Sequence, residues 1–467
     1  MSERNWERVM CIVFTTVMGF TVSQAVAAQA PASPDTLALT VEDALRIALT
    51  EGNTVRIADQ EVIKKKYDRK SAIAKLFPSV DATGNYNYTI QKQVMYLGNM
   101  KMPGMPEGGQ SKGIEVGRTY QVTGGVSAAL PVLNTQIWGA IALSREAVEL
   151  ALLQAEESRI NLYNQVVKTY YGILLAKESE QVIRSSYENA RTNYEQIKGK
   201  FDVGLVAEFN LLRADVSVKS LEPQVQAARD NVEASLNQLK ILLSLSIDQP
   251  ISCTEKLSEM EGPMYREYFA GEGLPQGNSQ LKQLDKQVDM LMTQEKMAKW
   301  TFLPSLNVVG FYRYNAMDDA FSWRDYNWIP FSAIQVTLTI PLFRGFDRIQ
   351  AVKKAQVSRA QVELQREQLR SSVRAEADRY RNNIRTAVKK YVSAKEAVRQ
   401  AEKGYKIAKV RYDLGSSTLV ELNDANLALA QSRLNYYQAL YDYIANDADL
   451  KRVRGDLPPL SLAKDDK

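Results

Sequence analysis

Residues 78–90 read PSVDATGNYNYTI, and residues 304–315 repeat much of this pattern as PSLNVVGFYRYN. The Pro-Ser start, the glycine and the two tyrosines of the first segment recur in the second at a constant offset of 226 residues. A second set of residues recurs at an offset of 211. Its first copy is Lys198, Asp202, Gly204, Leu211 and Ala214, and its second copy is Lys409, Asp413, Gly415, Leu422 and Ala425. The chain therefore contains two copies of one unit, and we expect the copies to build a single body.

Each copy opens with two segments in which apolar and polar residues alternate, at about 78–90 and 119–131, and at about 304–315 and 332–341. In the first segment Val80, Tyr86 and Tyr88 would share one face, opposite Asp81 and Asn85, which is the pattern of a strand with one apolar face. The segments have about the 9 to 11 residues that a tilted strand needs to cross a bilayer, and tyrosines near strand ends are typical of a membrane interface. A half-buried sheet on a soluble core would show the same alternation, so that alternative stays open on the strands alone.

A membrane interpretation of these strands requires assembly of several chains. Four strands cannot close a barrel, and unpaired strand edges are not stable in lipid. Two chains would supply about eight strands and three chains about twelve. The larger number suits a duct, because side chains nearly fill the interior of a barrel of about eight strands.

Two long stretches without proline, 132–222 and 342–457, are rich in residues that favour helices. They predict a helical hairpin in each copy, at about 136–245 and 347–453. The outgoing arm, at about 136–200 or 347–411, is one helix or two stacked helices, and such an arm would span about 100 Å. Each arm ends at a glycine turn, because glycine after a helical run is a C-terminal stop signal. Further helices are expected at 41–76, with Thr40 as its cap, and at 280–301.

The 467 residues divide into two repeats with short flanking segments. We expect residues 1–27 to be an export signal peptide, because an apolar run at 9–20 precedes the small residues Ala25-Val26-Ala27. The repeats are expected at 28–245 and 280–454, joined by a linker at 246–279. Residues 455–467 form a polar tail that we expect to be disordered.

The composition argues against an enzyme. The chain has no histidine, which removes the usual general base and the usual zinc ligand. Cys253 is the single cysteine after the signal peptide, and no catalytic or phosphate-loop motif is present. A methionine-rich loop at 91–118 could bind Cu(I), but a flexible loop is the simpler interpretation, and we expect no metal or cofactor. The net charge of +5, with basic residues mixed among glutamates, argues against nucleic-acid binding.

The chain resembles the TolC-like outer membrane efflux protein family over nearly all of the residues that follow the signal peptide. The resemblance rests on the Pro-Ser strand starts, on Pro131 and Pro341 at strand exits, on the two glycine turns and on residues 39–45, LTVEDAL. It implies an α+β membrane protein and a homotrimeric duct. Four strands per chain would form a barrel of about twelve transmembrane strands, continued by a long periplasmic α-helical barrel. It also implies the outer membrane of a Gram-negative bacterium as the location.

The same resemblance implies a passive exit duct for a tripartite efflux or type I secretion system. In this family the tip docks on a periplasmic adaptor (membrane fusion) protein, which is coupled to an inner-membrane pump, and the duct does no chemistry. The residues themselves also fit a different class, a periplasmic coiled-coil adaptor or scaffold. That class explains the helices and the export signal, but it does not explain four alternating strands.

Residues 415–425, GSSTLVELNDA, resemble the segment that lies at the periplasmic tip in this family. The resemblance places two acidic pore residues at Glu421 and Asp424, and their i, i+3 spacing puts both on one face of a helix. In a threefold assembly they would form two stacked carboxylate rings that attract cations. The structural alternative is two solvated acids near a helix N-terminus, where the helix dipole favours them.

Tip closure and adaptor docking are assigned by the same resemblance. Tyr412 matches a tyrosine that helps to hold the tip closed. Asn210 and Ser417 stand where well-known members have an aspartate and an arginine, so the charged latch of those members is missing here. The docking positions are those of the two turns: Val203, Gly204, Leu205, Leu414, Gly415 and Ser416.

Overall fold

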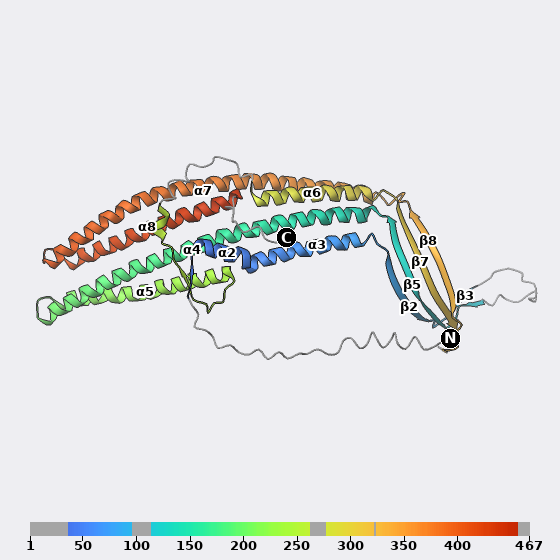
Figure 1. The fold of residues 1–467 in the computed structure, drawn as a ribbon, viewed down its shortest axis with the longest axis horizontal. Helices are drawn as coiled ribbons and strands as arrows, with labels where there is room; N and C mark the ends of the chain where they lie inside the picture. Colours follow the sequence, from blue (N-terminus) through green and yellow to red (C-terminus); the bar gives the residue numbers. More distant parts are fainter. Residues whose placement is uncertain (1–35, 96–113, 262–276, 322–323, 456–467) are drawn as a thin grey trace, which may run out of the picture.

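The computed structural model describes residues 36–95, 114–261, 277–321 and 324–455. A four-stranded sheet lies at one end of an elongated molecule, and long helices run from it to two hairpin turns at the other end (Figure 1). The expected signal peptide, most of the methionine-rich loop and the tail after Gly455 fall outside the described residues.

The sheet is antiparallel throughout, in the order β2-β5-β7-β8. Its strands are β2 (Ser79–Tyr88), β5 (Tyr120–Leu133), β7 (Ser305–Asp318) and β8 (Ile329–Thr339). The expectation that Pro131 ends the second strand was wrong, because β5 continues to Leu133 with a register irregularity at that point. Strands β2 and β8 form the two edges of the sheet, and Pro330 lies within β8, where an edge strand tolerates a missing N–H.

The register gives the sheet one apolar face and one polar face. Cross-strand pairs such as Tyr86 with Val122 and Val308 with Val336 bring the apolar positions together. This apolar face contains no Asp, Glu, Lys or Arg before Asp318 at the end of β7. Its larger side chains are Val80, Tyr86, Tyr88, Tyr120, Val122, Val126, Leu130, Leu306, Val308, Tyr312, Tyr314, Ile334, Val336 and Leu338. The polar face carries Asp81, Thr83, Asn85, Asn87, Gln121, Thr123, Ser127, Asn307, Arg313, Asn315, Gln335 and Thr337.

Two long helical hairpins extend from the sheet. The first consists of α4 (Thr135–Asp202, 68 residues) and α5 (Glu208–Leu243, 36 residues), and the second of α7 (Asp347–Asp413, 67 residues) and α8 (Leu419–Arg454, 36 residues). Both outgoing arms are single helices, each about 100 Å long. The return helix α5 passes through Pro223 without a break.

The return helices α5 and α8 are shorter than α4 and α7, and two shorter helices pack along the remaining length of these arms. Helix α3 (Asn53–Ala74) packs beside α4, and α6 (Ser279–Trp300) packs between α4 and α7 (Figure 1). The single helix expected at 41–76 was wrong, because α2 (Val41–Glu51) and α3 are separated at Gly52. The chain is extended there, and the N–H of Asn53 donates to Ser244 Oγ at 2.9 Å instead of continuing a helix. Thr40 caps α2, as expected.

Short strands were missed by the sequence patterns. In the expected linker, β6 (Ile251–Cys253) pairs in parallel with β1 (Leu37–Leu39), and a 3₁₀ helix follows at Leu257–Glu261. In the loop after β2, β3 (Gln93–Met95) pairs with β4 (Ile114–Val116). These strands have three residues each, so they are too short for an alternation pattern to show.

The main hydrophobic core lies in the middle of the helical body, between α2, α4, α7 and α8. Tyr170 is fully buried in it, and its hydroxyl donates to the carbonyl of Leu39 at 2.9 Å. This contact ties the small β1–β6 sheet to the middle of α4. Among the helices of the described residues, none is both long and apolar enough to cross a membrane.

Candidate functional site at the helical tips

The two hairpin turns are built alike. Gly204 and Gly415 have φ of +75° and +72°, in the left-handed region that favours glycine. In the first turn the N–H of Leu205 donates to Lys200 O at 2.8 Å, and in the second the N–H of Ser416 donates to Arg411 O, also at 2.8 Å. This 6→1 bond defines a Schellman motif, which satisfies a free carbonyl at the end of a helix.

The docking positions expected at these turns are exposed. Val203, Leu205 and Leu414 are 69%, 74% and 77% exposed. Both turns lie at the end of the molecule farthest from the sheet (Figure 1). The tips thus present small groups of exposed apolar side chains.

A small hydrophobic cluster joins the two tips. Ile197 of α4, Ala214 of α5 and Leu419 of α8 are buried in it, and Tyr412 packs against them. The Nζ of Lys200 lies 5.7 Å from the centroid of the Tyr412 ring, a cation–π distance. Tyr412 therefore contacts the first hairpin from the end of α7. Lys200 was missed in the sequence, although it occupies the same place in the first turn as Arg411 does in the second.

Glu421 and Asp424 lie in the first two turns of α8, and both are exposed. Thr418 caps the helix by accepting the N–H of Glu421 at 3.3 Å. The hydrogen bond from the Ser417 hydroxyl, followed by one from the main chain of Thr418, holds the pKa of the Glu421 carboxyl below its usual value. The site can therefore keep this negative charge at a pH lower than an ordinary glutamate allows.

Ser417 and Asn210 form no direct link in the described structure. The hydroxyl of Ser417 donates to Glu421 in its own hairpin. Asn210 lies half-exposed in the first turn of α5, where its N–H bonds to Ala207 O at 3.0 Å. The tip contact observed within one chain is the cluster around Tyr412.

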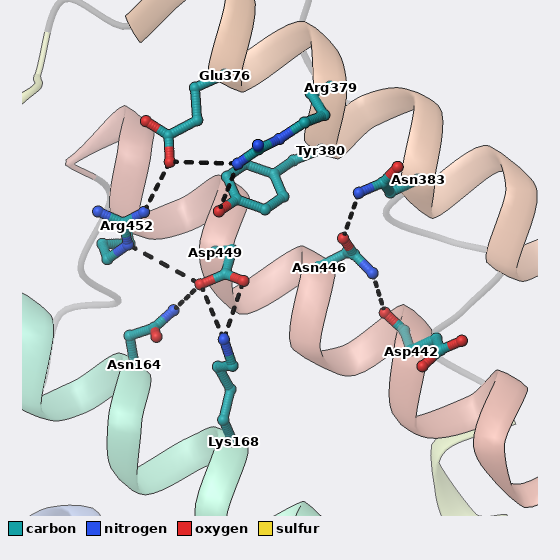
Figure 2. Close-up of polar contacts among 10 residues, drawn as sticks. All are labelled: Asn164, Lys168, Glu376, Arg379, Tyr380, Asn383, Asp442, Asn446, Asp449 and Arg452. Carbon is teal, nitrogen blue, oxygen red and sulfur yellow. Dashed lines mark hydrogen bonds and ion pairs between the residues drawn. The ribbon is translucent and has the colours of Figure 1, made fainter.

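A polar network that the sequence did not reveal joins the hairpins farther from the tips (Figure 2). Asp449 of α8 accepts hydrogen bonds from Asn164 Nδ2 at 3.0 Å and from Lys168 Nζ at 3.1 Å, both on α4. Arg452 approaches the same carboxylate at 3.9 Å and donates to Glu376 of α7 at 3.0 Å. We call these five residues the Asp449 network. It connects α4 of the first hairpin to both helices of the second.

A family model and several known proteins match most of the chain. The family model described as outer membrane efflux protein matches residues 44–244 and 274–456. The chain is 23% identical over 349 residues to the outer membrane protein TolC of Vibrio cholerae, covering 72% of this chain and 77% of that protein. It is 20% identical over 337 residues to TolC of Escherichia coli K12, covering 70% and 68%.

Solved structures share the fold. The outer membrane channel CmeC of Campylobacter jejuni superimposes with a TM-score of 0.69 at 18% identity, covering 89% of this chain and 85% of that chain. The MtrE outer membrane channel of Neisseria gonorrhoeae, solved in its open state, superimposes with a TM-score of 0.68 at 14% identity, covering 89% and 88%.

Proposed function

Because the chain belongs to the outer membrane efflux protein family, we propose that it is the exit duct of a tripartite efflux or type I secretion system. It is an outer membrane protein of the TolC type, with a large periplasmic part. Substrates would pass through it from a periplasmic adaptor and an inner-membrane pump to the exterior. The duct would be passive and would depend on these partners for energy.

The observation that carries the proposal is the sheet with two free edges and one apolar face free of charged residues along nearly its whole length. Strands β2 and β8 run antiparallel to each other, because the sheet has four strands that alternate in direction. Strand β8 of one copy can therefore pair with β2 of the next copy in the antiparallel manner of the rest of the sheet. Three copies would close a barrel of about twelve strands, with the apolar face toward lipid.

The helical body fits the periplasmic half of such a duct. Arms of 68 and 67 residues would reach about 100 Å from the barrel, several times the thickness of a bilayer. The exposed turn residues Val203, Leu205 and Leu414 would form the adaptor-docking surface. Glu421 and Asp424 would form the cation-attracting rings of the pore in the threefold assembly.

Conductance of the purified protein in planar bilayers tests the duct and its acidic rings together. We expect a small, cation-selective conductance, and we expect the Glu421→Ala/Asp424→Ala variant to lose most of this selectivity, because the rings supply the attracting charge. Glu208→Ala is the matched control, since Glu208 is an exposed acid in the first turn of α5 at the same end of the molecule.

The conductance result also distinguishes a duct from the alternative function. No conductance from folded protein would favour a periplasmic coiled-coil adaptor or scaffold instead of a duct. Equal selectivity in the native protein and the double variant would keep the duct but remove Glu421 and Asp424 as its selective residues.

The pH dependence of selectivity tests the contact between Ser417 and Glu421. The depressed pKa of Glu421 means that its charge persists as the pH falls and is lost only below the usual glutamate range. Ser417→Ala removes the hydroxyl hydrogen bond that contributes most to this depression, so the pKa of Glu421 should rise and selectivity should disappear at a higher pH. The measurement is the reversal potential as a function of pH, in an Asp424→Asn background that isolates Glu421.

Ser416→Ala is the control for this titration. Its hydroxyl donates to Arg411 O at 3.0 Å in the same turn and does not enter the contact with Glu421. A pH profile that moves equally in both serine variants would mean that the turn, and not the hydrogen bond, sets the pKa of Glu421.

A further inference from the structure

The polar face of the sheet carries one cationic and aromatic group of residues that the tip-based function does not use. Arg313 of β7 lies directly opposite Phe331 of β8 in the strand register. The guanidinium carbon of Arg313 is 4.5 Å from the centroid of the Phe311 ring, and the Phe311 and Phe331 centroids are 5.5 Å apart. We call these three residues the Arg313 cluster.

A glycine on the neighbouring strand makes room for the cluster. Gly125 of β5 pairs with Arg313. A Cβ at this glycine would lie 2.7 Å from Arg313 Cγ and 2.4 Å from the carbonyl oxygen of Tyr312, closer than real Cβ contacts allow. The missing side chain therefore lets the stem of Arg313 lie against β5 while its guanidinium stacks on Phe311.

The charge of Arg313 is not balanced by a nearby acid in the four described strands. Arg313 is exposed, and no ion pair joins it to another described residue. Asp81 is the acidic residue on the same face, and the register places it two strands from Phe311, about 10 Å away. The neighbouring positions on this face, such as Thr83, Thr123 and Asn315, are neutral. The cluster is therefore a local positive site beside two aromatic rings.

A guanidinium beside two phenylalanine rings favours one class of ligand. A guanidinium binds carboxylate or sulfonate oxygens through two parallel hydrogen bonds, and the faces and edges of phenylalanine rings pack against a flat apolar group. A ligand that satisfies both has an aromatic body and one anionic group.

We propose that the Arg313 cluster is a transit binding site for small aromatic carboxylates and sulfonates on the inner wall of the barrel. The proposal rests on the proposed function, because the polar face lines a lumen only when copies of the chain close the barrel. Three clusters would then face the same lumen near its outer part. The binding must be weak enough to release cargo, with a Kd on the order of 1 mM.

Current block by 1-naphthoate in planar bilayers tests this site. The native channel should show a concentration-dependent reduction of current with 1-naphthoate, and Arg313→Gln should raise the half-blocking concentration about tenfold, because one charge-assisted contact is lost. Phe331→Leu should raise it to a smaller extent. Acetate, which has the charge without the ring, and 1-naphthylmethylammonium, which has the ring with the opposite charge, should block neither channel at the same concentrations.

The matched control variant is Gln335→Ala, on the same face of β8 and outside the cluster. A conducting channel on which 1-naphthoate acts equally in the native and Arg313→Gln forms would overturn the site and leave the duct intact. Folded protein that never conducts would overturn the duct and the transit site together. Block by acetate as strong as block by 1-naphthoate would show a simple charge effect and would also overturn the aromatic site.

Discussion

Replacing Ile334 with arginine is expected to prevent assembly in the outer membrane, whereas replacing its neighbour Gln335 with arginine is expected to be tolerated. Ile334 is the sixth residue of the 11-residue strand β8, lies on the apolar face opposite Gly310, and is 79% exposed in the single chain. In the proposed barrel this side chain faces lipid near the middle of the bilayer. A lipid-facing arginine there costs about 2–4 kcal/mol in each chain, and a trimer would carry that cost three times.

The measurement is the amount of heat-modifiable oligomer in the outer membrane fraction. Gln335→Arg provides the matched control, because it introduces the same side chain one residue away on the polar face. Equal reduction of oligomer in both variants would mean that arginine disturbs β8 on either face, so that contact with lipid is not the cause. Normal assembly of Ile334→Arg would contradict a lipid-facing sheet.

The alternation that supports this prediction could be read from the sequence because a strand repeats every two residues. Val80, Tyr86 and Tyr88, which the alternation placed on one strand face, all lie on the apolar face of the sheet. The long arms were also accessible, since a stretch without proline and rich in helix formers leaves few alternatives. The sequence could not decide between one helix and two stacked helices, because both share the same local pattern.

Local sequence patterns did not predict the backbone conformation where contacts with residues distant in the chain determine it. The break at Gly52 is accompanied by a hydrogen bond from Asn53 to Ser244, which lies nearly 200 positions away in the chain. The same holds for the parallel pairing of β1 with β6, which joins two segments of three residues each. Neither segment carries enough residues to show a period, so only the folded core reveals them.

The candidate site at the tips could also be predicted only in part from the sequence. The two turns could be located from the offset of 211 residues, and both contain a glycine in the left-handed region. The contacts around them were not predictable, because Lys200 reaches Tyr412 across the two hairpins. Ser417 stands where a latch arginine was expected, and in this chain its hydroxyl donates a hydrogen bond to Glu421.

Removing the carboxylate of Asp449 is expected to weaken the connection between the two hairpins. The Asp449 side chain is 14% exposed and faces Asn164 and Lys168 of the first hairpin (Figure 2). In Asp449→Ala the Lys168 ammonium would remain in a half-buried place without its closest acid. Breaking a fully buried ion pair costs about 3–5 kcal/mol, and the partial exposure of Lys168 reduces the expected loss of stability to about 2 kcal/mol. Far-ultraviolet circular dichroism of thermal unfolding would record it as a lower midpoint.

A second substitution shows whether this loss comes from the charge. Lys168→Met removes the cation that Asp449→Ala leaves unpaired, so the double variant should be more stable than Asp449→Ala alone. Asp442→Ala is the matched single control, because Asp442 lies two turns earlier in α8 and its carboxylate accepts a hydrogen bond from Gln438 of the same helix. If Asp449→Ala and Asp442→Ala lower the midpoint equally, or if adding Lys168→Met lowers it further, the network does not join the hairpins through Asp449. Recovery in the double variant would instead mean that Asp449 and Lys168 are energetically coupled across the two hairpins, and that the loss in Asp449→Ala comes from the unpaired ammonium.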